Sequence, residues 1–321
     1  MEEFVLAGDL GGTNLRVAAV DVTGRLLFRA EADTPRCSDG RKIVETAADL
    51  ANQCREKLGS DPRAFGFAIP AIMAAEQGRI FSSPNLPELA GYELADSLRS
   101  QLGLTVILEN DANAAAIGEY WLGASKGART SICVTLGTGV GGGMIINGEL
   151  HSGPDGTAGE VGHICVEPLG PPCGCGSNGC LEQFSSASAI VRMARELIDE
   201  YPDSALVSTE GFDALQVFRY GMEGDPLCVE VFRRAGAYLG IALAGLINVL
   251  NPEAIVIGGG AADGWDLFIE STRSEIKKRA FLEPAERARI VRASLGSDAG
   301  IVGVAFLAFQ KSGRVGRSNT L

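Results

Sequence analysis

The chain has 321 residues and a formal net charge of −12, and 46% of its residues are hydrophobic. This apolar content is enough to bury a core, which excludes a disordered chain. The acidic balance excludes a protein that binds nucleic acid through clustered lysines and arginines. At about 100–200 residues per domain, the length predicts two domains.

No segment has the length of a membrane span. The longest apolar run, Leu239–Leu250, has twelve residues and contains Asn248, whereas about 20 are needed to cross a bilayer. The start, Met1-Glu2-Glu3, is acidic, unlike the basic start of a signal peptide. We therefore predict a cytoplasmic protein with reduced thiols. Five scattered cysteines are expected to be inert: Cys37, Cys54, Cys133, Cys165 and Cys228.

The first part of the chain predicts strands followed by helices. Hydrophobic runs bounded by turn residues indicate strands, and an apolar periodicity near 3.6 residues indicates helices. The expected strands are Phe4–Asp9, Leu15–Val22, Arg25–Ala32, Ala64–Pro70 and Val106–Glu109. The expected helices are Lys42–Leu58 and Asp111–Gly118.

The pattern of a strand, a glycine turn and a hairpin then occurs a second time. The expected strands are Thr130–Leu136, Gly143–Ile146, Glu149–His151, Glu253–Ile257 and Ile290–Ser294. The expected helices are Ser186–Tyr201, Leu227–Leu250, Leu267–Phe281 and Gly300–Phe309, and we predict a disordered tail over Lys311–Leu321. Strands that alternate with helices predict an α/β fold.

Three glycine turns follow predicted strands, at Gly11-Gly12-Thr13, Gly137-Thr138-Gly139 and Gly258-Gly259-Gly260. Glycine lets backbone N–H groups approach a phosphate closely, and a threonine adds a hydroxyl donor. Each turn alone is equally an ordinary hairpin turn, but the three together favour phosphate binding. Asp9 precedes the first turn, and a carboxylate beside phosphate indicates an intervening Mg²⁺.

These motifs resemble the two phosphate motifs and the adenosine motif of the actin/hexokinase/Hsp70 superfamily. Three further motifs make the chain similar to the ROK family of bacterial sugar kinases and repressors: Glu109-Asn110-Asp111-Ala112-Asn113-Ala114-Ala115, Gly156-Thr157-Ala158-Gly159-Glu160-Val161-Gly162-His163 and Cys173-Gly174-Cys175-Gly176-Ser177-Asn178-Gly179-Cys180-Leu181-Glu182. The resemblance covers residues from about 5 to 309 in the same order.

The resemblance implies a two-lobed, actin-like (ribonuclease H-like) α/β fold with a catalytic cleft between the lobes. Residues 1–119, joined by the helix 300–310, would form the small lobe, and 120–299 the large lobe, with 311–321 as a flexible tail. The nucleotide would be bound by Asp9, Gly11, Gly12, Thr13, Asn14, Gly137, Thr138, Gly139, Gly258, Gly259 and Gly260.

A second cluster predicts a metal site. Cys173, Cys175 and Cys180 offer three thiolates within eight residues, and glycines between them let the loop close around an ion. Three buried thiols without a metal are the alternative. The resemblance implies that His163 is the fourth ligand, whereas His151 has no such context. A site of three cysteines and one histidine has no vacant position, which predicts a structural Zn²⁺.

The resemblance also implies a sugar site. It assigns hexose contacts to Asn85, Asn110, Asp111, Glu160, His163 and Glu182, and it makes Asp111 the catalytic base. From their positions alone, Asn85 is a turn residue and Asp111 a helix N-cap. The chain departs from the family at Pro70-Ala71, where a glycine usually follows the proline. The added methyl group puts the identity of the hexose in doubt.

We therefore expect an ATP- and Mg²⁺-dependent glucokinase of the ROK type that forms a homodimer and binds neither nucleic acid nor membrane. A ROK kinase for fructose, mannose, N-acetylmannosamine or N-acetylglucosamine is the main alternative, and polyphosphate is an alternative donor. A ROK repressor is disfavoured, because only eight residues precede Asp9 and the chain is acidic. The helix Leu227–Leu250 is a core element or a dimer surface, and we favour the core.

Overall fold

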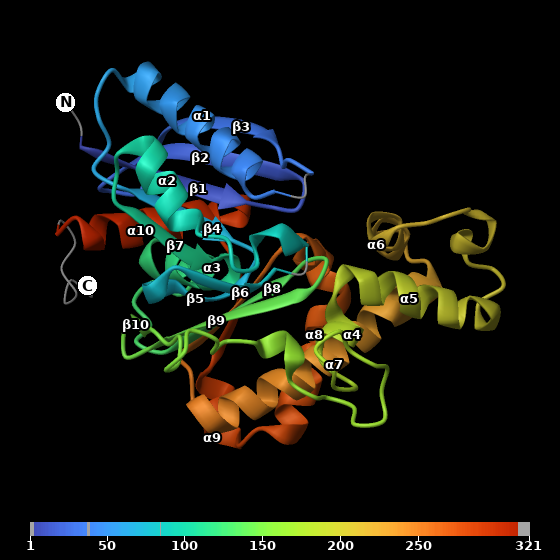
Figure 1. Cartoon of the computed structure of the whole chain (residues 1–321). Coiled ribbons are helices and arrows are strands. Elements are labelled where there is room, and N and C mark those ends of the chain that lie inside the picture. The colour runs from blue at the N-terminus through green and yellow to red at the C-terminus, as the bar shows by residue number, and fades with distance from the viewer. Residues whose placement is uncertain (1–2, 37–38, 84, 314–321) are drawn as a thin grey trace. The chain divides into compact units, whose positions relative to one another are not determined.

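The computed structural model describes residues 3–36, 39–83 and 85–313. These residues form two compact units (Figure 1). The first unit comprises residues 1–129, 143–159 and 294–321, and the second comprises 130–142 and 160–293. The chain therefore passes from one unit to the other four times. The predicted lobe boundaries place 120–129, 143–159 and 294–299 differently, and they stay a prediction.

The first unit is built on a five-stranded sheet with the order β3-β2-β1-β4-β7. Its first three strands are antiparallel, and β4 and β7 run parallel to β1. The bounds are β1 Phe4–Leu10, β2 Asn14–Asp21, β3 Leu26–Asp33, β4 Phe65–Ile69 and β7 Val106–Asn110. Because β1, β4 and β7 are parallel, their carboxyl ends lie at one edge of the sheet.

Helices cover both faces of this sheet. Alternate residues of β1 point to opposite faces: Phe4 and Leu6 join one apolar cluster, and Val5 and Ala7 join the other. The first cluster includes residues of α1 (Arg41–Leu58) and α2 (Leu94–Leu102). The second includes residues of α3 (Asp111–Trp121) and α10 (Ala299–Lys311). The result is a three-layer α/β/α unit.

The helices α3 and α10 pack with their backbones almost in contact. A Cβ on Gly118 would lie 2.2 Å from the carbonyl oxygen of Ala299, and one on Gly303 would lie 1.8 Å from that of Ala114. Only glycine fits at these two positions. The remaining elements of this unit are short: β5 Ile72–Ala74, β6 Arg79–Ser82, β10 Glu149–Leu150, and the 3₁₀ helices η1 Ala75–Gln77, η2 Pro87–Leu89 and η7 Gly296–Asp298.

The second sheet has the order β10-β9-β8-β11-β12, and the division between the units falls within β9. The strands β8, β11 and β12 are parallel. The bounds are β8 Ser131–Leu136, β9 Val140–Ile146, β11 Ala254–Gly258 and β12 Arg289–Arg292. The helices of the second unit are α4 Glu182–Ser185, α5 Ala187–Leu197, α6 Ala214–Met222, α7 Pro226–Leu250, α8 Trp265–Arg279 and α9 Leu282–Arg287, with 3₁₀ helices η3 Val161–His163, η4 Ile198–Glu200, η5 Ala205–Ser208 and η6 Gly260–Gly264.

The long helix α7 belongs to the core of the second unit. Leu239, Leu243 and Ile247 are at most 1% exposed. The neighbouring helix α8 packs closely on α7, because a Cβ on Gly236 would lie 2.3 Å from the carbonyl oxygen of Phe268. The core assignment for this helix is confirmed. Within the described residues, no helix combines the length and apolar character needed to cross a bilayer.

The α/β prediction is confirmed, and most predicted elements occur within a few residues of their expected bounds. The strand predicted to begin at Gly143 begins earlier, because β9 starts at Val140 and contains Gly141–Gly143. The helix predicted to Tyr201 ends at Leu197 and continues as 3₁₀ helix. The hairpin β5–β6 and the helices α2, α6 and α9 were not predicted. Cys37 and residues 314–321 of the predicted tail lie outside the described residues, whereas Lys311 ends α10.

Candidate functional site

The first glycine turn, between β1 and β2, is hydrogen-bonded by Thr34. Thr34 donates its hydroxyl to the carbonyl of Gly11 at 2.6 Å and its backbone N–H to the carbonyl of Thr13 at 2.7 Å. Gly12 and Thr13 are exposed, and a Cβ on Gly12 would meet no atom within 4 Å. The hydrogen bonds of Thr34 thus fix the shape of the turn, while the backbone of Gly12 and Thr13 stays accessible to solvent.

Asp9 lies just before this turn and pairs with Arg16. The hairpin register places the two residues opposite each other, and Arg16 donates to Oδ2 of the carboxylate. Burial raises the pKa of Asp9 above its usual value, against the opposing effect of Arg16. Arg16 was not predicted, although the hairpin register around the glycine turn could have identified it.

The predicted catalytic residue comes to the same edge of the sheet. Asp9 is in register with Ala68 of β4, and Ala68 is in register with Glu109 of β7. Neighbouring strands lie about 4.8 Å apart, so Asp9 and Glu109 are separated by two strand spacings. Asp111 follows directly as the first residue of α3.

The N-cap of the helix α3 is Asn110. The expectation from position alone, that Asp111 is the N-cap, is therefore wrong. The Asn110 side chain accepts from the backbone N–H groups of Ala112 at 2.9 Å and Asn113 at 3.0 Å. Asp111 is exposed and accepts from the N–H of Ala112 at 2.9 Å. The N-cap of α3 is therefore Asn110, and Asp111 is the first residue inside the helix.

A buried carboxylate supports this helix start. Glu109 accepts from the backbone N–H of Asn110 at 2.9 Å and from the side chain of Asn113 at 3.0 Å. Burial raises the pKa of Glu109, and these hydrogen bonds oppose that shift. Within the described residues, Oδ1 of Asn113 is buried without a hydrogen-bond partner. Glu109 therefore connects the end of β7 to the first turn of α3.

The departure from the family at Ala71 lies against Asn110. Ala71 is 3% exposed, and its carbonyl accepts from the Asn110 side chain at 3.1 Å. The preceding Pro70 carbonyl accepts from the hydroxyl of Ser83 at 2.7 Å, which ties in the segment that carries Asn85. Asn85 itself is exposed. The first unit thus gathers Asn110, Asp111 and the neighbourhood of Ala71.

The second phosphate turn lies in the other unit and is tied to Glu182. Glu182 accepts from the backbone N–H of Val140 at 3.0 Å. A Cβ on Gly139 would lie 2.4 Å from Oε2 of this carboxylate, so glycine is needed for the close approach. Thr138 is exposed at the tip of the turn. A residue predicted to contact the sugar therefore also shapes the phosphate turn.

The third glycine turn lies beside the second. The strands β8 and β11 are parallel, with Thr135 in register with Gly258. Gly259 has a φ of +85°, and a Cβ there would lie 2.4 Å from the carbonyl oxygen of Leu136. An apolar pocket next to both turns is lined by Leu136, Ser185, Ile190, Phe232, Ala235, Gly236, Leu239, Ala261 and Phe268.

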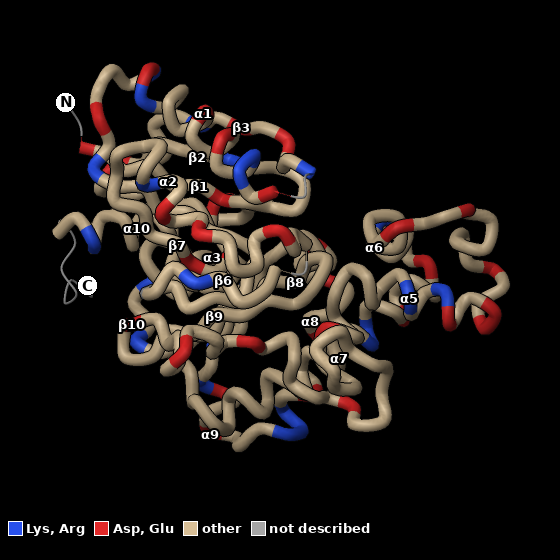
Figure 2. Tube along the Cα trace, in the orientation of Figure 1, with Lys and Arg blue, Asp and Glu red and all other residues tan. Residues whose placement is uncertain are grey.

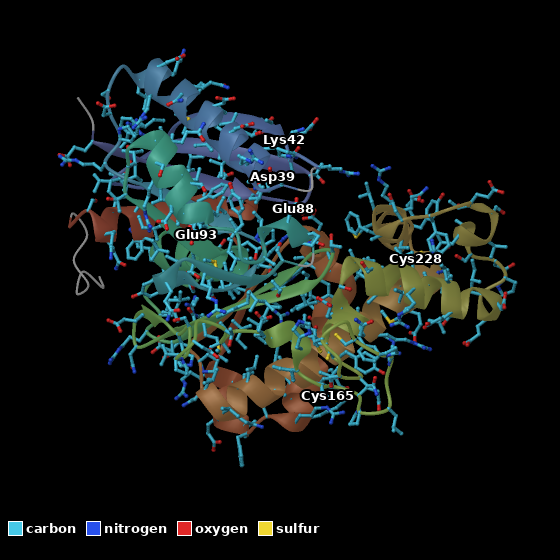
Figure 3. All side chains as sticks on the ribbon, viewed as in Figure 1. Asp39, Lys42, Glu88, Glu93, Cys165 and Cys228 are labelled. Carbon is cyan, nitrogen blue, oxygen red and sulfur yellow. The ribbon has the colours of Figure 1, made fainter. Side chains whose placement is uncertain are left out.

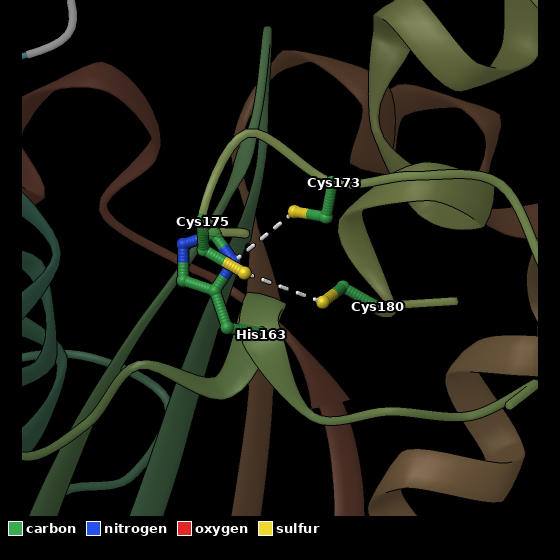
Figure 4. Close-up of side chains that lie close together, drawn as sticks. All are labelled: His163, Cys173, Cys175 and Cys180. Carbon is green, nitrogen blue, oxygen red and sulfur yellow. Dashed lines mark hydrogen bonds between the residues drawn. The ribbon is translucent and has the colours of Figure 1, made fainter. Parts of the chain in front are cut away.

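The four predicted metal ligands converge (Figure 4). Their ligand atoms all lie within 4.8 Å of one another. The Sγ atoms of Cys175 and Cys180 are 3.7 Å apart, and Sγ of Cys173 is 3.6 Å from Nδ1 of His163. Tetrahedral zinc, with Zn–S near 2.3 Å and Zn–N near 2.0 Å, requires edges of about 3.8 Å and 3.5 Å. The donor set and its spacing therefore fit zinc.

His163 turns its two ring nitrogens to different neighbours. Nδ1 faces Cys173, while Nε2 lies 3.9 Å from Oε2 of Glu160. The pKa of Glu160 is raised, mainly by burial and further by the charge of Glu182, whereas His163 lowers it. The second unit thus brings together Glu160, His163 and Glu182, next to the three cysteines and the second glycine turn.

Accessible glycine turns at the carboxyl ends of parallel strands, with an acidic residue beside the first, define a class of α/β proteins that bind nucleoside phosphates. A family model described as "ROK family" matches residues 5–311. The chain belongs to the ROK family, which confirms the resemblance.

Relatives of known structure and name are similar over their full length. A glucokinase of Halalkalibacterium halodurans is 36% identical over 326 residues, covering 99% of this chain and 98% of the relative. A crystal structure of a ROK family glucokinase from Streptomyces griseus, in complex with glucose and AMPPNP, is 36% identical with a TM-score of 0.83, covering 96% of this chain and 99% of that one. The ROK hexokinase from Thermus thermophilus is 32% identical with a TM-score of 0.83, covering 97% and 100%.

Proposed function

We propose that this ROK sugar kinase transfers the γ-phosphoryl group of ATP to the 6-hydroxyl of glucose, with Asp111 as the catalytic base. The observation that carries the proposal is the separate placement of Asn110 and Asp111 at the start of α3. Asn110 caps the helix, and the carboxylate of Asp111 is exposed at the carboxyl edge of the sheet that also ends in Asp9 and the first glycine turn.

Asp111 would accept the proton of the sugar hydroxyl as its oxygen attacks the γ-phosphorus. A carboxylate that accepts several backbone N–H bonds has a lowered pKa and is a weaker base. The N-cap role, which brings such bonds, belongs to Asn110. In phosphoryl transfer, positioning and charge neutralisation supply most of the rate enhancement, so a carboxylate held by a rigid helix start suits the reaction.

The nucleotide would be bound through backbone groups. The three glycine turns offer N–H groups to phosphates, and the hydroxyls of Thr13 and Thr138 add donors. The exposed glycines Gly259 and Gly260 of the third turn, which lies beside the second, support a position for the adenosine there. The ATP analogue in the Streptomyces griseus relative favours ATP over polyphosphate as the donor.

Asp9 would hold Mg²⁺, whose charge would neutralise the phosphates. The site fits the ion, because Mg²⁺ takes carboxylate oxygens. Arg16 contacts Oδ2 of Asp9, and Oδ1 lies on the side of Gly300, where a Cβ would be 3.5 Å away.

The hexose would be recognised by Asn85, Asn110, Asp111, Glu160, His163 and Glu182. His163 can serve both predicted roles, because Nδ1 faces the cysteines and Nε2 is on the side of Glu160. Zinc bound at Nδ1 would fix the ring and its tautomer. Glucose is proposed because two of the three relatives above are glucokinases. Other hexoses and N-acetyl sugars are the alternatives, since Ala71 departs from the family.

The test is the variant Asp111→Asn. It keeps the shape of the side chain and removes the base, so kcat should fall by about 10³-fold or more, with glucose binding retained. A coupled assay of ADP release gives kcat for a panel of hexoses and N-acetyl sugars, and calorimetry gives the affinity for glucose. Near-normal turnover would exclude Asp111 as the base.

Asp266→Asn is a matched control. Asp266 is also an acidic residue in the first turn of a helix, α8, and it is not part of the proposed site. Its turnover should equal that of the parent protein. If another sugar of the panel is phosphorylated with a higher kcat/KM than glucose, that sugar would replace glucose as the proposed substrate. The assignment of Asp111 as the base would not be affected.

A further inference from the structure

Cys165, expected to be inert, lies directly opposite a predicted zinc ligand. Cys165 and Cys180 form an antiparallel bridge. Val166 donates its N–H to the carbonyl of Gly179 at 2.9 Å, and Leu181 donates to that of Ile164 at 2.8 Å. These two bonds flank the cysteines, so Cys165 and Cys180 are a non-hydrogen-bonded pair of the antiparallel bridge. In such a pair the two side chains lie on the same face of the paired segments, and the Cα atoms are about 4.5 Å apart.

This separation suits a disulfide. Bridged cysteines have Cα atoms about 4.4–6.8 Å apart, with both Cβ atoms facing each other. Cys180 is fully buried, and its Sγ belongs to the group of four predicted metal ligands. Cys165 is exposed and does not belong to that group. An accessible thiol therefore faces a ligand thiol across two paired segments.

We propose that Cys165 and Cys180 are an oxidation site, at which a hydroperoxide converts the two thiols into a disulfide and releases the zinc. The proposal rests on the zinc site of the proposed function. It adds a second partner for Cys180 that the metal-binding motif does not contain.

The chemistry has two steps. The sulfur of Cys165 attacks the peroxide, so that an S–O bond forms, the O–O bond breaks and water leaves, giving a sulfenic acid. The sulfur of Cys180 then attacks the sulfur of Cys165, the S–S bond forms, and the S–O bond breaks with loss of a second water. The two thiols lose two electrons, which reduce one hydrogen peroxide to two waters.

The disulfide would remove one of four zinc ligands, which lowers the affinity for the metal. The effect would reach the phosphate turn through the chain. Glu182 follows Cys180 by two residues and accepts from the N–H of Val140 at 3.0 Å. Oxidation should therefore reduce activity along with zinc content, and a thiol reductant with added zinc should restore both.

A different disulfide is the competing product. The Sγ atoms of Cys175 and Cys180 are only 3.7 Å apart, so direct oxidation of the ligands would join these two residues. Cys165 would then have no part in the loss of zinc. The order of events proposed here differs, because the exposed thiol outside the ligand set reacts first.

The experiment treats the zinc-loaded protein with stoichiometric hydrogen peroxide. Zinc release is followed with a chromophoric chelator, and disulfides are mapped by mass spectrometry of non-reduced peptides. We expect about one zinc released per Cys165–Cys180 disulfide. In Cys165→Ser, release should slow about tenfold or more, because the first oxidation step is lost. Cys228→Ala is the control, since Cys228 is buried in α7. It lies away from the paired segment that carries Cys165 (Figure 3).

Zinc release at the parental rate in Cys165→Ser, or a mapped Cys175–Cys180 bridge, would overturn the proposal. If the purified protein holds no zinc, the zinc part of the proposed function fails by itself. Peptide mapping of the metal-free protein then decides on the pair, with the Cys165–Cys180 bridge in favour and any other bridge against.

Discussion

Asn110 and Asp111 show how adjacent polar residues divide two tasks. Both residue types are good N-caps, so the sequence alone does not say which of them caps α3. In the structure the asparagine accepts the N–H groups of Ala112 and Asn113, and the aspartate is one position inside the helix. The choice depends on the backbone of Asn110, which is extended, with ψ of 142°.

Gly139 sets the distance between the second phosphate turn and Glu182. In Gly139→Ala the Cβ would lie 2.4 Å from Oε2 of Glu182, so the carboxylate must leave the N–H of Val140. We expect KM for ATP to rise about tenfold or more, equal to ~1.4 kcal/mol of binding. Steady-state kinetics measure this change. Gly245→Ala, where a Cβ meets no atom within 4 Å, should leave KM unaltered.

Glu109 makes the stability of the protein depend on pH. Its pKa is raised in the folded protein by burial, so the folded state holds the proton when the unfolded state, near pKa 4.3, has lost it. The free energy of unfolding therefore falls as the pH rises from about 4.3 through the folded pKa, and this contribution levels off above it. Glu109 is thus most favourable to folding at low pH.

In Glu109→Gln this contribution should disappear. Urea unfolding between about pH 5 and about pH 8 should show a smaller loss of stability with rising pH than in the parent protein. Gln keeps an oxygen to accept from Asn110 and Asn113, so the fold should be retained. Parallel pH profiles for the two proteins would contradict the assignment.

At the scale of elements, glycines join helices as well as turns. Many of the 42 glycines lie in the three glycine turns and in the loop of the predicted metal ligands. The structure also uses Gly118 and Gly303 between α3 and α10, and Gly236 and Gly240 between α7 and α8. The sequence does not reveal why such a position requires glycine. The atom that would clash with a side chain belongs to a segment far away in the sequence.

The same limit explains which elements could be predicted. Strands with continuous apolar runs, such as β1, β8 and β11, were found because they are buried on both faces. The β5–β6 hairpin and the helices α2, α6 and α9 were not predicted, because each of these strands and helices has nine residues or fewer. Segments this short show no clear hydrophobic periodicity. The three cysteine ligands were predicted from their close spacing and His163 from the family resemblance. Arg16 and Thr34 instead act through pairing that the motifs do not contain.

Two substitutions in α7 should have opposite effects on stability. Gly245 is exposed and a Cβ there meets no atom within 4 Å, whereas a Cβ on Gly240 would lie 2.5 Å from the carbonyl oxygen of Thr272. Gly245→Ala should raise the free energy of unfolding by about 1 kcal/mol through helix propensity. Gly240→Ala should lower it by about 1–3 kcal/mol through overpacking. Chemical denaturation checks both, and equal signs would contradict the packing of α7 on α8.

At the scale of the whole molecule, an acidic protein would bind an anionic nucleotide. The net charge is −12, and Figure 2 shows basic residues interspersed with acidic ones along the trace. The proposed phosphate contacts are backbone N–H groups and threonine hydroxyls. Affinity for the nucleotide should then depend little on attraction by lysine or arginine.

Salt tests this expectation. Raising the ionic strength from about 0.02 M to about 0.2 M shortens the Debye length to roughly a third, which weakens repulsion between protein and nucleotide. KM for ATP, at constant free Mg²⁺, should stay level or fall. The neutral hexose is an internal control, and its KM should not change. A several-fold rise of KM for ATP with salt would point to a cationic phosphate site.

The four passages of the chain between the units have a consequence for synthesis. The sheet of the first unit is complete by Asn110, but one of its faces is covered by α10, which begins at Ala299. At about 5–20 residues per second, a ribosome needs roughly 10–40 s between these points. During that time Val5, Ala7 and Ala68 lack part of their apolar cover, so the nascent first unit exposes apolar surface until α10 is made.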